Sequence, residues 1–193
     1  MPTTVADLVD PATTAVLTCE MQRGIIGDRA IDPVLARAAA DAGIVVAGNR
    51  LVAAARSVGA KVVHNTYGAR ADRAGIAVNT RAMAAALKHG RMIVDGTPDV
   101  EVIAELGPEP EDIVVHRIHG YTPFTGTELD SVLRNMAIRT VVPIGISLNE
   151  CVLGTCLSAA DLGYRIVLPV DGVVAIPPAY GEHVLEHLSL IHI

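Results

Sequence analysis

Cys151, Glu20 and the pair Arg117 and His119 each follow a run of apolar, β-branched residues. A thiol, a carboxylate and a cationic or imidazole group are the parts of a nucleophilic hydrolase. The carboxylate accepts the proton of the thiol and later returns it to a leaving group. These residue types therefore point to covalent chemistry on a carbonyl compound, if the fold brings them together.

Cys151 lies at or near the first turn of an expected helix over residues 150–162. The exposed N–H groups and the dipole of such a turn are expected to lower the pKa of the thiol and to hold a developing oxyanion. The alternative is a small buried hydrophobic residue, which is our interpretation of Cys19 and Cys156. Glu20 ends an apolar strand, where a carboxylate is costly unless it has a partner or faces a cavity. The alternative interpretation of Glu20 is an ordinary solvated carboxylate in a loop.

The elements that must position these groups alternate along the chain. We expect strands at 14–19, 61–65, 112–117, 139–145 and 164–170, and helices at 33–57, 79–87, 127–136 and 150–162. Gly43 and Gly48 weaken the first helix and allow a break there. This alternation predicts an α/β fold, a single doubly wound three-layer α/β/α domain with a mainly parallel sheet. Because ligands bind beyond the carboxyl ends of such strands, the three chemical groups are expected at one edge.

Composition limits the partners. The net charge of −6 argues against nucleic acid, and no uninterrupted apolar run is long enough to span a membrane. The three cysteines form no CxxC pair, so we expect free thiols and a cytoplasmic location. The chain contains no Gly-rich phosphate loop, and we expect no cofactor. His64, alone after its strand, is more typical of a hydrogen-bonded structural residue than of a metal ligand.

Four segments, taken in order, resemble the isochorismatase-like cysteine hydrolases, which include nicotinamidases and N-carbamoylsarcosine amidases. The resemblance covers nearly the whole chain. Its segments are 15–22 (Ala-Val-Leu-Thr-Cys-Glu-Met-Gln, where the family normally ends in Asp-Met-Gln), 121–130 (Tyr-Thr-Pro-Phe-Thr-Gly-Thr-Glu-Leu-Asp), 145–152 (Gly-Ile-Ser-Leu-Asn-Glu-Cys-Val), and 161–167 with Asp171.

The resemblance implies a Cys–Asp–Lys constellation, in which water hydrolyses a thioester intermediate. By position, Cys151 is the nucleophile and Glu20 takes the place of the acid–base residue. The family commonly has a cis non-proline peptide bond, here at Ile146–Ser147, which would turn the Ser147 N–H toward an oxyanion hole beside that of Cys151. The resemblance thus implies an amide or related C–N hydrolase with a small-molecule substrate, and a homo-oligomer.

Two departures leave alternatives open. Glu20 is one methylene longer than the family's Asp, and the family's Lys position falls on Ile118. Arg117 and His119 flank that position, but strand alternation points them to the opposite face unless the strand bends at Gly120. Arg117 can hold a carboxylate but cannot donate a proton, whereas His119 can do either. Arg117 can equally be a solvated strand end.

These departures keep two other functions in view. Some members of the family cleave a vinyl ether with the acid alone, and Glu20 suits that chemistry. A non-catalytic binding protein is the third reading.

The last six residues, 188–193, match a translation of a common sequencing-library adapter. We therefore expect a hydrolase domain over 1–187, followed by a non-native tail, with the last strand of the sheet lost by truncation at the C-terminus.

Overall fold

The strands pair in parallel in the order β3-β2-β1-β4-β5, with β6 also paired to β4. This arrangement comes from a computed structural model that describes residues 4–188. The strands are β1 (Thr14–Cys19), β2 (Lys61–Tyr67), β3 (Ile113–Arg117), β4 (Thr140–Ile146), β5 (Arg165–Ile166) and β6 (Val173–Val174). The helices are α1 (Pro33–Asp41), α2 (Ile44–Ser57), α3 (Arg81–Lys88), α4 (Leu129–Asn135), α5 (Leu153–Asp161) and α6 (Pro178–Leu188).

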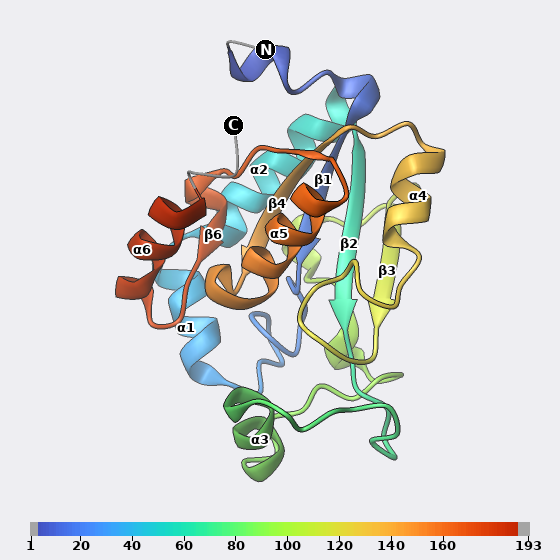
Figure 1. Cartoon of the computed structure of the whole chain (residues 1–193). Coiled ribbons are helices and arrows are strands. Elements are labelled where there is room, and N and C mark those ends of the chain that lie inside the picture. The colour runs from blue at the N-terminus through green and yellow to red at the C-terminus, as the bar shows by residue number, and fades with distance from the viewer. Residues whose placement is uncertain (1–3, 189–193) are drawn as a thin grey trace.

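Both faces of the sheet are covered, as the α/β prediction requires (Figure 1). Alternate residues of β1 enter different cores, because neighbouring side chains on a strand point to opposite faces. Leu17 and Cys19 pack with α4, α5 and α6, whereas Val16 packs with α1 and α2. The three-layer architecture is thereby confirmed.

Two expected elements are divided. The helix over 33–57 breaks at Gly43, which adopts a left-handed conformation with φ of 67° and separates α1 from α2. The expected strand over 164–170 is wrong beyond Ile166. The chain makes a 3₁₀ turn at Val170–Gly172, after Pro169, which has no N–H to donate, and returns to β4 as β6.

Among the described residues, no single helix is long and apolar enough to cross a membrane, although α1 and α2, bent by 66°, pass that test of length and composition as a pair. Leu188 is buried at the end of α6. The rest of the expected tail, residues 189–193, lies outside the described residues.

The sheet is tightest where β1 meets β4, next to the Cys151 turn. Gly145 lies opposite Cys19 and has a φ of 117°. A Cβ added at Gly145 would lie 2.2 Å from the Cys19 carbonyl oxygen. No side chain fits between these two strand ends.

Gly145→Ala is therefore expected to lower the free energy of unfolding by about 3 kcal/mol or more, because backbone strain and a steric clash add together. Gly43→Ala is the matched control. Gly43 also has a positive φ, but a Cβ there meets nothing within 4 Å. The free energy of unfolding should therefore fall by only about 1 kcal/mol in Gly43→Ala. Urea unfolding of both variants measures the difference. Equal losses would contradict the close approach of β1 and β4.

Candidate active site

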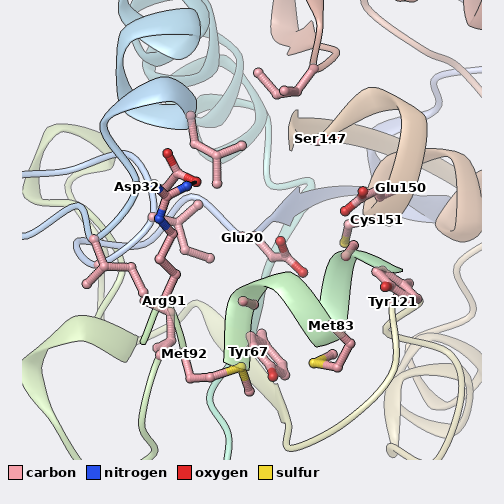
Figure 2. A pocket seen from close by; sticks show the side chains of 18 of the residues that line it. Glu20, Asp32, Tyr67, Met83, Arg91, Met92, Tyr121, Ser147, Glu150 and Cys151 are labelled. Atoms are coloured by element: carbon pink, nitrogen blue, oxygen red, sulfur yellow. Dashed lines mark hydrogen bonds and ion pairs between the residues drawn. The ribbon is translucent and has the colours of Figure 1, made fainter. Parts of the chain in front are cut away.

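A cavity of about 340 Å³ opens at the carboxyl edge of the sheet. Its inner end is lined by Glu20 after β1, Tyr67 of β2, Arg117 of β3, and Ser147 and Cys151 after β4. Figure 2 shows Glu20 and Cys151 close together on the same side of the cavity. The predicted convergence of strand ends thus places a carboxylate, a guanidinium and a thiol around one space.

Glu20 sits in an unusual backbone conformation, with a φ of 54° in the left-handed region. Its N–H donates to the carbonyl of Asn65 at 3.0 Å. Two residues later, buried Gln22 is held by Tyr67: the Gln22 amide donates to the Tyr67 carbonyl and accepts from the Tyr67 N–H, both at 2.8 Å. These bonds fix the end of β1 against β2 and maintain a conformation that costs about 1–3 kcal/mol.

Arg117 is the cation of the site. Its side chain is only 2% exposed; Nη2 forms an ion pair with the Glu20 carboxylate, and Nε donates to the Gly120 carbonyl. Its guanidinium also lies 5.3 Å from the centre of the Tyr67 ring. Burial lowers the pKa of Arg117, but attraction to Glu20 and to the Cys151 sulfur outweighs burial, so the pKa is raised above its usual value.

The expectation that alternation turns Arg117 away from the site is therefore wrong. Arg117 ends β3 opposite Tyr67 of β2, and both of these side chains line the cavity. Ile118, where the motif spacing placed the lysine, is not among the lining residues. His119 is not among them either, and its ring lies beside Gly126. Of the two candidates for the cation, only Arg117 therefore lines the cavity with Cys151 among the described residues.

The turn that carries Cys151 is a π-helical turn over Leu148–Val152, which leads into α5. The peptide bond between Ile146 and Ser147 is cis, at the position that the family resemblance indicated. The Ser147 hydroxyl donates to the side-chain carbonyl of Asn149 at 2.8 Å, and Asn149 is bonded in turn to both backbone groups of Ile176. The segment before Cys151 is therefore fixed by hydrogen bonds within the turn and by hydrogen bonds to Ile176.

The pKa of Cys151 is raised well above the ordinary thiol value, contrary to the expectation from its helix position. The neighbouring Cys19 thiol is the largest cause, followed by burial and the negative charge of Glu20; Arg117 acts in the opposite direction. Cys151 is 1% exposed, and such burial disfavours the charged thiolate. The raised pKa favours the neutral thiol of Cys151 over the thiolate.

Two further residues at the site were not anticipated. Cys19 is buried in the core, as the sequence interpretation expected, but its thiol also neighbours that of Cys151, which strand alternation with Leu17 could have indicated. Glu150 lines the cavity, and its pKa is raised, first by burial and then by the charge of Glu20. The position of Glu150 directly before Cys151 in the sequence could have indicated that it lies at the site.

His64 belongs to a separate buried network. Its Nδ1 lies 2.9 Å from the Thr18 hydroxyl and its Nε2 lies 3.2 Å from the Asp112 carboxylate, which also binds Arg56. Burial lowers the pKa of His64, although Asp112 opposes this. Within residues 4–188, no group of three or more His, Cys, Asp or Glu side chains could hold a metal ion.

Comparison with known proteins identifies the family. The isochorismatase domain family matches residues 14–192. The chain belongs to the isochorismatase domain family. An isochorismatase family protein from Desulfovibrio vulgaris has a similar structure, with a TM-score of 0.77 and 26% identity, over 92% of this chain and 90% of that one. The N-carbamoylsarcosine amidase of Thermoplasma acidophilum matches with a TM-score of 0.66 and 27% identity, over 91% and 92% of the two chains.

Among curated relatives, the ureidoacrylate amidohydrolase RutB of Agrobacterium fabrum is 36% identical over 91 residues, which are 47% of this chain and 40% of RutB. The matched region spans less than half of the curated relatives' length. The similar structures and sequences therefore include enzymes that cleave amides of small molecules.

The charges around Cys151 predict the direction in which the reactivity of its thiol changes when Glu20 is neutralised. Glu20→Gln removes a charge that raises the pKa of Cys151 and leaves the opposing Arg117 charge in place. Alkylation of Cys151 by iodoacetamide at about pH 7.5 should therefore become roughly threefold faster or more. Peptide mass spectrometry over a time course gives the rate. Glu105→Gln, a change at an exposed carboxylate outside the cavity, is the control and should leave the rate unchanged. Slower alkylation in Glu20→Gln would contradict this account.

Proposed function

We propose that this protein is a hydrolase that cleaves a C–N bond of a small amide or ureide through a thioester on Cys151. The observation that carries the proposal is the meeting of Cys151, Glu20 and Arg117 in one cavity. The amidase and amidohydrolase relatives support the same reaction class.

In the first half-reaction, Glu20 accepts the thiol proton as the Cys151 sulfur attacks the substrate carbonyl. A buried neutral thiol favours this general-base route over a preformed thiolate. The tetrahedral oxyanion takes its hydrogen bonds from the backbone N–H groups of Ser147 and Cys151. Glu20 then delivers the proton to the leaving nitrogen, and the C–N bond breaks to leave the thioester.

In the second half-reaction, a water molecule replaces the departed amine. Glu20 takes a proton from this water, whose oxygen attacks the thioester carbonyl, and then returns the proton to the departing Cys151 sulfur. Arg117 stays cationic throughout, because a guanidinium does not deprotonate in this pH range. Its role is to orient the Glu20 carboxylate and to stabilise negative charge near the sulfur.

Vinyl-ether cleavage is the competing function, because a neutral Cys151 is compatible with chemistry that needs only an acid. The presence of the Cys151 thiol and the Glu20 carboxylate in one cavity, together with the amidase and amidohydrolase relatives, favours amide cleavage instead. We further propose that the enzyme works in the cytoplasm as a homo-oligomer. Its three free cysteines suit a reducing compartment.

Substitutions separate these functions. Cys151→Ala should reduce kcat/KM for amides by roughly 10³-fold or more, because it removes the sulfur that forms the thioester. Glu20→Gln should cause a loss of similar order. Cys156→Ala is the control, since this buried thiol does not line the cavity. Steady-state assays with amides, ureides and a vinyl ether provide the measurement. Vinyl-ether cleavage that survives Cys151→Ala and fails in Glu20→Gln would overturn the proposal.

A further inference from the structure

Beyond Glu20 much of the cavity wall is apolar, and we call this part of the cavity the outer chamber. Figure 2 shows the cavity running from Cys151 past Glu20 and Met83 toward Asp32 and Arg91. The outer chamber is lined by Ile31, Val34, Leu35, Met83, Met92 and Ile93. We propose that it binds an apolar substituent, so that the substrate is an uncharged amide or ureide; this inference rests on the proposed function.

The charged side chains at the far end of the outer chamber satisfy one another. Asp32 accepts from Arg91 at 2.7 Å through one oxygen and caps the Val34 N–H at 3.0 Å through the other. Arg91 therefore already has a carboxylate partner, and a substrate carboxylate bound there would lie close to the negative charge of Asp32. His89 also lines the cavity, but it is exposed, where an ion pair is worth little.

The charges at the inner end also disfavour an anionic substrate. Glu20 and Glu150 both line the cavity, and the single buried guanidinium of Arg117 is paired with Glu20. A substrate carboxylate would add like charge to this group. Arg117 Nη1, however, is buried without a hydrogen-bond partner among the described residues. A neutral carbonyl oxygen could satisfy this donor without adding charge.

The size of the cavity sets the length of the substituent. A group the size of a water molecule occupies roughly 30 Å³, so 340 Å³ holds on the order of ten non-hydrogen atoms. An amide or ureide head uses three or four of them. The remaining space suits an alkyl chain of four to six carbons or one small ring.

One wall of the outer chamber is adaptable. Met83 belongs to α3, a helix without buried residues, and methionine side chains adjust readily to irregular apolar groups. The N-cap of α3, Thr80, is hydrogen bonded at 2.6 Å to the hydroxyl of Tyr121, which lines the cavity near Cys151. Helix α3 can therefore contact the substituent while staying linked to the inner end.

The test compares substrates of matched length. Hexanamide is compared with glutaramate, and butylurea with 3-ureidopropionate, by kcat/KM. The wild type should prefer the neutral member of each pair by at least about tenfold. Met83→Arg places an unpaired cation in the chamber and should reduce that preference by about tenfold or more. Met83→Leu, the control, conserves apolar volume and should leave the preference within about threefold. An equal or greater rate with the anionic member in the wild type, or an unchanged preference in Met83→Arg, would overturn the inference.

Binding distinguishes this inference from the proposed function. If no amide or ureide is hydrolysed, the proposed function fails, and calorimetric titration of the Cys151→Ala variant then decides the inference. Tighter binding of hexanamide than of glutaramate supports it. Equal affinity, tighter binding of glutaramate, or no binding of either compound overturns it.

Discussion

The ion pair between Glu20 and Arg117 is the interaction on which the site depends. It joins the ends of β1 and β3 across β2, and it lies at a sheet edge where Arg117 is almost completely buried. A buried charge without a partner costs about 3–5 kcal/mol, so neither residue is easily lost without the other. The same pair fixes the Glu20 carboxylate beside Cys151. It also engages the Arg117 guanidinium at the inner end of the cavity, so that neutral groups are the suitable ligands there.

The surroundings of the thiol explain why a base is needed. Cys19, burial and Glu20 all raise the pKa of Cys151, and Arg117 opposes them. In the proposed mechanism, proton transfer to Glu20 during attack forms the nucleophile only when a carbonyl carbon is present to receive it. A buried, neutral thiol is also protected from oxidants in solution, because the thiolate is the reactive form.

Sequence reasoning predicted the parallel α/β sheet and the meeting of Cys151 with Glu20, because both follow from alternating patterns and strand ends. It named Arg117 and His119 as the two candidates for the cation but did not choose between them, whereas the register of β3 with β2 brings Arg117 to the cavity. Gly120, the residue at which a bend was considered possible, follows with a φ of 73°. The raised pKa of Cys151 depends on its contact with Cys19, which is 132 residues away in sequence and becomes visible only in the packed core.

The central claim is that Glu20 removes the proton of Cys151 as a thioester forms. Quenched-flow mass spectrometry with a hydrolysed amide measures this step directly. The account predicts an acyl group on the peptide that contains Cys151 in the wild type, and much slower formation of that adduct in Glu20→Gln, even though its thiol is alkylated faster. Turnover without an acyl group on Cys151, or equal rates of adduct formation in the two proteins, would contradict it.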